Sequence, residues 1–576
     1  MPARRAVASL VNALAAVAPR FSPADSAEKV RLLDALADRA FGQPAALLRF
    51  HETLCFLAAY PDDPRVLGRV DRALQGFESR VRGLTPAAQA RLYDSGLAGT
   101  ALDYPFGRPM TRWLLSRFPD LVEVAWEKFD GGDQLDEAFS LLITPVEEDA
   151  FSYGGLGWEG WLRAAKGGRP LSDLRLIVEL LELSPLPDGV RDWWFERLGL
   201  PIRWRLRGPG ASRTLAKVPW DRPYYHRTPL RRSGVEMLRE IARPSPVPRR
   251  APRPLAEVLI ETARAALATR FRELHTFSHA NPGDVLVFDP GRGIRIALIG
   301  NLPTYRFPLE GYYAFLALKN GVPVCYGGGC ALFDALDFAL NIFPSFRQGE
   351  SAFLTTQIFA AFHRALGTRT AIIDPYQIGN ENEEAIRSGA FYFYHRLGYR
   401  PRDPEVVRLA EAELTNIARD RSYRSPVPVL RRLARAELYL VLPGGDPEPE
   451  KRLRVSQVAA IVSGHIARTF AGDRGAAIRD ATGRVARALG MVRWKAWPMD
   501  ERMAFERMAV VLGLLPDLAQ WPAADRRALV RLIRAKGGRD ELTYIRLLDR
   551  HRRLRSSLES LVRPVEPILD SWERGS

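Results

Sequence analysis

Apolar residues recur at intervals of three and four along the first 242 residues, which is the period of a half-buried helix. The pattern is clear at Lys29–Phe41, Leu47–Tyr60 and Leu174–Leu183. The same period returns from residue 405 to the end, in segments rich in arginine and leucine. We therefore predict mainly helical regions at residues 1–242 and 405–576.

Alternating prolines interrupt this pattern at residues 243–254, which read Arg-Pro-Ser-Pro-Val-Pro-Arg-Arg-Ala-Pro-Arg-Pro. Proline fixes φ and cannot continue a helix, so the segment favours a polyproline-like spacer. We predict an extended linker here, with its arginines in solvent.

Beyond the linker the apolar pattern changes to that of short strands and helices. Asn320-Gly321 stands between two apolar runs, and both residues tolerate positive φ, so this dipeptide predicts a hairpin turn. Asp289–Gly293 predicts a second hairpin turn. The expected strands are Val285–Phe288, Ile294–Ile299, Tyr312–Leu318, Val322–Tyr326, Asp337–Phe343 and Thr370–Ile373, and the expected helices are Pro254–Leu274, Ser351–Leu366 and Glu383–Leu397. This order predicts a mixed α/β (α+β) domain at 255–404, with a mixed sheet, between the two helical regions.

Composition narrows the class of protein and its partners. The chain has 576 residues, of which 47% are hydrophobic and 26% charged, as in globular proteins. Its net charge of +16 favours polyanions. Only eight of the 83 basic residues are lysines, an arginine bias typical of a GC-rich genome, so we expect only weak affinity for nucleic acid.

The cysteines and the apolar runs bear on the compartment. Cys55, Cys325 and Cys330 are too few for a disulfide framework, which indicates a reducing compartment. No apolar run reaches the 18 residues of a spanning helix. Met1–Ala18 ends in a sequence that resembles a signal-peptide cleavage site, but we interpret it as an amphipathic helix. We expect a cytoplasmic protein with no membrane partner.

A turn between a predicted strand and a predicted helix holds the first candidate site. The segment Leu340–Ala352 leaves the strand that ends at Phe343 and opens the helix that begins at Ser351. Main-chain amides at a helix N-terminus lack helical partners and carry about half a positive charge, so they bind anions. Arg347 would add a charge-assisted hydrogen bond to a phosphate.

A second segment, Ala390–Pro401, ends the last predicted helix with the sequence Ala-Phe-Tyr-Phe-Tyr-His-Arg-Leu-Gly-Tyr-Arg-Pro. Together with the turn, it resembles the GNAT acyltransferase superfamily over roughly residues 280–402. That family carries a strand, an R/Q-x-x-G-x-G/A turn, a helix, a strand and a helix ending in a Phe-Tyr-x-x-x-Gly-Phe-like motif. Tyr394 matches the motif tyrosine, and Gly398-Tyr399 matches its end.

The turn matches the family motif at its two ends and departs from it in the middle. Arg347 corresponds to the first motif residue and Ala352 to the last. Glu350 stands where the family has its middle glycine, and Gly349 lies one place earlier. A carboxylate beside a pyrophosphate repels it unless its side chain points away.

The resemblance implies an N-acyltransferase that takes acetyl-coenzyme A or another acyl-coenzyme A as donor and a small-molecule or peptide amine as acceptor, with no metal. In the family the turn binds the donor's pyrophosphate, and the tyrosine, here Tyr394, often protonates the departing thiolate. The donor-binding residues implied here are Ile342, Phe343, Arg347, Gln348, Gly349, Ser351 and Ala352.

Amide formation also needs a group that accepts the amine's proton and an N–H for the carbonyl oxygen. Glu350, Asp337 and Asp374 are the candidate proton acceptors. The main chain at Ile342 and Phe343 is the candidate oxyanion donor, if the strands separate there.

Two alternatives stay open. One is a non-catalytic GNAT-like binding or scaffold protein that has lost the cofactor site, which Glu350 favours. The other is association with nucleic acid through arginines such as those at 546–555.

Two further features of the sequence bear on possible sites, a pair of histidines and a run of three glycines. His275 and His279 stand four residues apart, a spacing that suits one helix face, but we identify no third ligand and expect no metal site. Gly327-Gly328-Gly329, between Cys325 and Cys330, predicts a close approach of main chains that would line the acyl pocket.

Overall fold

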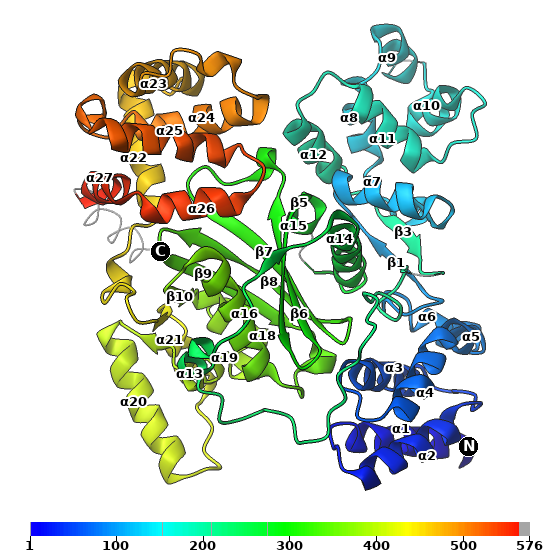
Figure 1. The fold of residues 1–576 in the computed structure, drawn as a ribbon. Coiled ribbons are helices and arrows are strands. Elements are labelled where there is room, and N and C mark those ends of the chain that lie inside the picture. Colours follow the sequence, from blue (N-terminus) through cyan, green and yellow to red (C-terminus); the bar gives the residue numbers. More distant parts are fainter. Residues whose placement is uncertain (1, 153, 209, 273–274, 564–576) are drawn as a thin grey trace. The chain divides into compact units, whose positions relative to one another are not determined.

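The computed structural model describes residues 2–152, 154–208, 210–272 and 275–563. The chain forms two compact units. The first comprises residues 1–229, 258–279 and 320–323, and the second comprises 230–257, 280–319 and 324–576. Helices at both ends and a mixed sheet between them confirm the predicted mixed α/β class (Figure 1).

The first unit is mainly helical and holds a small antiparallel sheet in the order β1-β3-β2. Its strands are β1 (Ala101–Tyr104), β2 (Val122–Val124) and β3 (Ile202–Arg205). Its helices are α1 (Pro2–Val17), α2 (Pro23–Leu36), α3 (Pro44–Ala59), α4 (Pro64–Gln75), α5 (Phe77–Arg82), α6 (Pro86–Ala90), α7 (Arg108–Arg117), α8 (Gly132–Ser140), α9 (Pro145–Ser152), α10 (Gly157–Lys166), α11 (Asp173–Leu183), α12 (Asp188–Arg197), most of α14 (Arg253–Ala268) and α15 (His275–Ser278). The last two residues of the helix predicted at 254–274 lie outside the described residues.

Local chemistry sets the helix starts, and aromatic packing fills the core of this unit. Ser22 and Asp25 form a reciprocal capping box at the start of α2. Around the central strand, Trp204 packs against Trp113 and Phe118, with ring centroids 6.0 and 5.1 Å apart. Trp204, Trp113 and Phe118 are therefore core anchors of this unit.

The second unit is built on a sheet with the strand order β11-β12-β10-β9-β8-β7-β6-β5-β4 in the described residues. The chain runs up and down from β5 to β9, returns parallel in β10, and places β12 antiparallel between β10 and β11. The strands are β4 (Arg249–Arg250), β5 (Ala280–Gly291), β6 (Ile294–Asn301), β7 (Gly311–Lys319), β8 (Val322–Leu332), β9 (Ala335–Ile342), β10 (Thr370–Ile373), β11 (Arg400–Pro401) and β12 (Leu438–Val441).

The Asn320-Gly321 turn between β7 and β8 forms as predicted. Both residues have positive φ, 48° and 80°. A side chain at position 321 would meet the carbonyl oxygen of Val218 at 2.2 Å, so this turn requires glycine for space as well as for conformation.

The helices of the second unit pack on this sheet and extend beyond it (Figure 1). Phe359 and Phe362 of α16 face Phe338 of β9, with ring centroids 6.3 and 6.0 Å apart, so α16 covers the sheet at β9. The helices are α13 (Met237–Ala242), α16 (Ser351–Leu366), α17 (Pro375–Ile378), α18 (Glu383–Ser388), α19 (Ala390–Arg396), α20 (Pro404–Arg419), α21 (Val427–Leu433), α22 (Val455–Phe470), α23 (Arg474–Leu489), α24 (Met499–Leu512), α25 (Ala523–Lys536), α26 (Glu541–Arg550) and α27 (Arg552–Val562).

Several elements differ from the sequence prediction: β8, for example, was predicted to end at Tyr326 and continues to Leu332, and three other differences have a clear local cause. Arg249–Arg250, inside the predicted linker, pairs with β5 as an edge strand. Leu438–Val441 forms β12 inside the region predicted to be helical. Gly389 breaks the helix predicted at 383–397 into α18 and α19, because its left-handed conformation (φ 67°, ψ 39°) ends one helix and starts the next.

Candidate functional site

The end of β9 has an unpaired main-chain edge. β10 pairs with β9 from Thr370 and Ala335 to Ile372 and Asp337, and β10 ends one residue later. β9 continues to Ile342, so residues 338–342 have no strand on their β10 side among the described residues. We call this main-chain edge of residues 338–342 the open edge.

Hydrogen-bond alternation shows which groups of β9 face the open edge. The N–H of Phe343 donates to the carbonyl of Val324 on β8, at 3.1 Å. In an antiparallel pair, the neighbouring residue points its N–H and C=O the other way. Ile342 and, by the same alternation, Leu340 therefore present their N–H groups to the open edge. Of the two predicted oxyanion donors, Ile342 is available and Phe343 is already bonded.

The turn after β9 leads into the first amides of α16. A short 3-10 helix, Pro344–Phe346, leads into it, and the N–H of Gly349 donates to Phe346. The first intrahelical N–H of α16 is that of Leu354, which donates to the carbonyl of Glu350. The amides that precede it in α16 have no helical acceptor, as at any helix N-terminus.

The side chains of the turn surround these amides at the surface. Arg347 and Gln348 are exposed, while Ser351 and Ala352 are half-buried. The guanidinium of Arg347 donates to the carbonyl of Ile342 at 3.2 Å and forms an ion pair with Glu384. Arg347 therefore links the turn to the end of β9.

Glu350 is buried, with 1% of the residue exposed, and its carboxylate points to three donors. One oxygen accepts from Arg292 at 2.5 Å and from the main-chain N–H of Arg231 at 3.1 Å, and the other accepts from Lys319 at 3.1 Å. The carboxylate makes no capping bond to α16. Both of its oxygens are thus occupied and its charge is neutralised, which suits a residue that fixes the turn better than one that accepts a proton.

Tyr394 lies on α19 and is 3% exposed, with its ring 5.5 Å from that of Tyr399. Burial, with a smaller effect of Cys325, raises the pKa of Tyr394 well above its usual value. Cys325 pairs with Ile342 across β8 and β9, so this interaction indicates that Tyr394 lies near the end of β9. The raised pKa keeps the phenol protonated and also makes it a weaker acid than a free tyrosine.

The carboxylates of the other two candidate proton acceptors, Asp374 and Asp337, have different partners. The carboxylate of Asp374 caps α17 by accepting the N–H of Tyr376 at 2.8 Å. Asp337 forms an ion pair with Arg452 at 2.9 Å, and burial raises the pKa of its carboxyl group. Asp337 is also the last β9 residue paired with β10, so it stands at the start of the open edge.

The three glycines of β8 allow the close approach that the sequence predicts. A Cβ at Gly328 would lie 2.1 Å from the hydroxyl of Tyr312, and one at Gly327 would lie 2.1 Å from the carbonyl oxygen of Ala339. Cys325 and Cys330 are free thiols. Whether this surface lines an acyl pocket stays a prediction.

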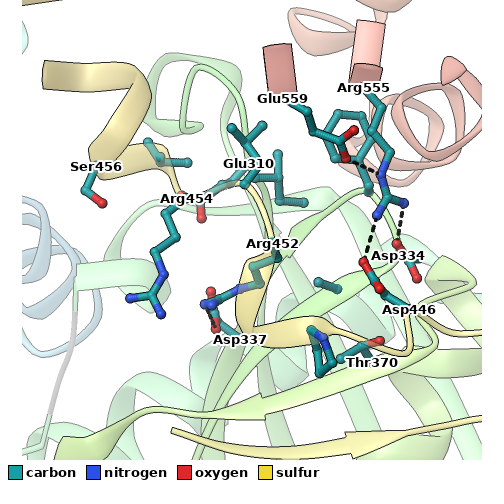
Figure 2. A pocket seen from close by; sticks show the side chains of 16 residues that line it. Glu310, Asp334, Asp337, Thr370, Asp446, Arg452, Arg454, Ser456, Arg555 and Glu559 are labelled. Carbon is teal, nitrogen blue, oxygen red and sulfur yellow. Dashed lines mark hydrogen bonds and ion pairs between the residues drawn. The ribbon is translucent and has the colours of Figure 1, made fainter. Parts of the chain in front are cut away.

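A pocket of about 270 Å³ is lined by the first residues of β9 and β10, whereas the turn follows the last residue of β9. Figure 2 shows the side chains that line it. We call it the charged pocket. Its lining consists of Glu310, Leu332, Phe333, Asp334, Ala335, Asp337, Thr370, Asp446, Pro449, Arg452, Leu453, Arg454, Val455, Ser456, Arg555 and Glu559. Only Asp337 was a candidate from the sequence, because the other residues come from separate segments without a common motif.

Two further observations concern the histidine pair and the helices. The rings of His275 and His279 lie 4.8 Å apart, and the described residues contain no group of three or more His, Cys, Asp or Glu that could hold a metal ion. Within the described part of the chain, no helix has both the length and the apolar character needed to cross a bilayer.

Comparisons with known proteins give no match: no family model, no curated protein and no solved structure is similar to this chain. The site must therefore be interpreted from its own geometry.

Proposed function

We propose that the second unit is an N-acyltransferase that moves an acyl group from acyl-coenzyme A to an amine. The observation that carries the proposal is the segment β9–turn–α16–β10. β9 and β10 are parallel, and because β10 ends before β9 does, the open edge of β9 lies beside the N-terminus of α16. This arrangement supports the GNAT-like interpretation of Arg347–Ala352 and Tyr394.

The turn has the properties needed to hold a diphosphate. The first amides of α16 supply donors, and the exposed guanidinium of Arg347 would contact a phosphate by releasing its partner Glu384. Glu350, the residue that departs from the family motif, directs its carboxylate to Arg292 and Lys319. Its negative charge is therefore neutralised by neighbours, which removes the repulsion that a free carboxylate would exert on the donor.

The residues along the open edge suit the chemistry of amide formation. The donor supplies an activated acyl group as a thioester. As the N–C bond forms and the C–S bond breaks, an ammonium acceptor loses two protons. One proton reaches Asp337 through water and passes to solvent, the N–H of Ile342 or Leu340 stabilises the carbonyl oxygen, and Tyr394 donates a proton to the leaving thiolate. The second proton from nitrogen restores Tyr394.

We also infer a reducing, cytoplasmic location. This inference about location rests on the proposed acyl-coenzyme A donor and on the three cysteines. All three are free thiols in the structure, as is usual in a reducing compartment.

Titration with acetyl-coenzyme A tests the proposal. Calorimetry on the full chain should give saturable binding, and the variant Ser351→Asp should bind roughly tenfold or more weakly, because a carboxylate at the first residue of α16 repels the pyrophosphate. The same change stabilises a helix N-terminus by about 0.3–1 kcal/mol, so a loss of fold is not expected.

The matched control is Ala523→Asp, which places the same charge at the exposed first residue of α25. It should leave the affinity for acetyl-coenzyme A unchanged. No binding by the unmodified chain would leave the alternative of a scaffold protein that has lost its cofactor.

A further inference from the structure

We propose that the charged pocket binds the primary ammonium group of a diamine or of a lysine-like side chain. Binding of the ammonium group is argued from the pocket alone. The identification of this ligand as the acyl acceptor rests on the proposed function.

The pocket has more carboxylates than guanidinium groups. Its lining contains five acidic residues and three arginines. Arg555 alone holds three of the carboxylates, those of Asp334 at 2.6 Å, Glu559 at 3.0 Å and Asp446 at 3.4 Å, and Figure 2 shows this cluster on one side of the pocket. The pocket therefore carries a net negative charge.

The opposite side is held by Arg452, which pairs with Asp337 at 2.9 Å and with Glu437 at 3.1 Å. Arg454 also pairs with Glu437, at 3.2 Å. All three guanidinium groups are thus engaged with carboxylates, so the pocket offers no unpaired cation to an anionic ligand.

Glu310 is the acidic residue of the pocket lining whose carboxylate pairs with no arginine among the described residues. Its side chain makes no hydrogen bond or ion pair with any described residue, although it lines the pocket. Burial, together with the nearby charge of Asp337, raises the pKa of Glu310, and the charges of Lys536 and Arg452 partly oppose this shift. A carboxylate in this position gains from a bound cation, which would supply the missing partner.

Thr370 provides a second, independent indication of a ligand. It is 1% exposed, lines the pocket, and its hydroxyl has no hydrogen-bond partner among the described residues. Because Thr370 pairs with Ala335, its side chain points to the same face of the sheet as that of Asp337. Buried hydroxyl groups normally have a partner, so this one is suited to bind a donor in the pocket.

An ammonium group fits these acceptors better than a metal ion does. An ammonium carries three N–H donors and can bond to a carboxylate and a hydroxyl at once. A divalent ion needs several free carboxylate oxygens, whereas four of the five carboxylates here already hold an arginine. The volume, about 270 Å³, suits a small amine or the end of a side chain.

The distance to the open edge favours a ligand with two amino groups. Leu340 lies five residues beyond Ala335, the register partner of Thr370, which is roughly 17 Å along a strand. An acceptor anchored in the charged pocket by one ammonium therefore needs a long chain to bring a second amine to the open edge. A long diamine, or a peptide anchored by a lysine side chain, meets this requirement, and a short monoamine does not.

Calorimetry on the full chain with cadaverine as the probe tests the site. Cadaverine should bind saturably and neutral pentane-1,5-diol should not. Glu310→Gln and Thr370→Val should each weaken cadaverine binding roughly tenfold. The hydroxyl of Thr370 makes no hydrogen bond that the substitution would break, so Thr370→Val should melt within about 1 °C of the unmodified chain.

The control variant is Glu411→Gln, which removes an exposed carboxylate of α20 outside the pocket. It should bind cadaverine normally. Unchanged binding in Glu310→Gln and Thr370→Val would overturn the proposal, as would equal binding of the diol. If the chain binds Mg²⁺ but not cadaverine, and Glu310→Gln abolishes the binding of Mg²⁺, the pocket is a metal site and the ammonium proposal is wrong.

A parallel titration with acetyl-coenzyme A separates the two proposals. Binding of cadaverine without acetyl-coenzyme A would support the ammonium site and contradict the transferase. Binding of acetyl-coenzyme A without cadaverine would overturn the ammonium site and leave the transferase with another acceptor site.

Discussion

Tyr394 is the residue that we propose as the proton donor to the leaving thiolate. Burial is the main cause of its raised pKa, with a smaller effect of Cys325 on β8. Tyr394→Phe removes only the hydroxyl. Turnover of acetyl-coenzyme A should fall by roughly a hundredfold, while the affinity for it changes by less than about twofold. Steady-state kinetics with calorimetry checks both values.

Tyr392→Phe is the matched control on the same helix, because the Tyr392 hydroxyl bonds to Ser425 at 2.6 Å, a contact unrelated to β9. Turnover in this variant should stay close to that of the unmodified chain. Equal losses of affinity and turnover in Tyr394→Phe would contradict its role as a proton donor.

The residues of the turn could be selected from the sequence, whereas the charged pocket could not. Arg347 and Ala352 belong to one short motif beside a predicted strand and helix. Arg555, Thr370 and Glu310 lie far apart in the chain and meet only when the sheet and the C-terminal helices pack. Glu350 shows the same limit: its motif position was visible, but its partners Arg292 and Lys319 were not.

Substitutions at two glycines test how backbone conformation affects the stability of the helices. Gly389 separates α18 from α19 at φ 67°, and Gly483 lies inside α23, where a Cβ would have no neighbouring atom within 4 Å. Gly389→Ala should cost about 1–2 kcal/mol, because alanine is strained at positive φ. Gly483→Ala should gain about 0.5–1 kcal/mol, because alanine favours a helix interior. Thermal melting of both variants checks the opposite signs.

The ends of helices and strands were predicted correctly where residues that start or end such elements stand at the limits of the apolar pattern. α16 and β10 have the predicted ends, Ser351–Leu366 and Thr370–Ile373, and Gly367 ends α16 in the left-handed conformation. β12 was missed because Leu438–Val441 is a run of four apolar residues, in which helical and β periods cannot be distinguished. Its position between β10 and β11 depends on pairing across the sheet, which the local sequence does not encode.

The arginine-rich C-terminal region shows what the high positive charge does within the second unit. Arg546 donates to the carbonyl of Ala365 at the end of α16, at 2.9 Å. Arg555 holds Asp334 at 2.6 Å, and Arg553 pairs with Asp525 at 3.3 Å. These arginines hold helices to the sheet and to one another. Their charge is partly neutralised inside the protein, which weakens the case for a nucleic-acid surface at 546–555.

Asp284 makes the stability of the second unit depend on pH. It is fully buried and accepts from the hydroxyl of Tyr313 at 2.7 Å and from the N–H of Glu541 at 2.8 Å. Burial raises its pKa to about 6, although Arg306, 3.9 Å away, opposes the shift. The folded chain therefore holds this proton more tightly than the unfolded chain does. The free energy of unfolding should fall as the pH rises from about 4 to 6, by roughly 3 kcal/mol from this group.

Comparison with Asp284→Asn isolates that contribution, because the amide does not titrate while other groups titrate in both proteins. The stability of the unmodified chain relative to Asp284→Asn should be highest near pH 4 and should decrease until about pH 6, above which it stays constant. Thermal melting of both proteins across this range measures the difference. A relative stability that increases with pH would mean that the folded chain prefers the ionised carboxylate, so that Tyr313 and the N–H of Glu541 outweigh the cost of burying its charge.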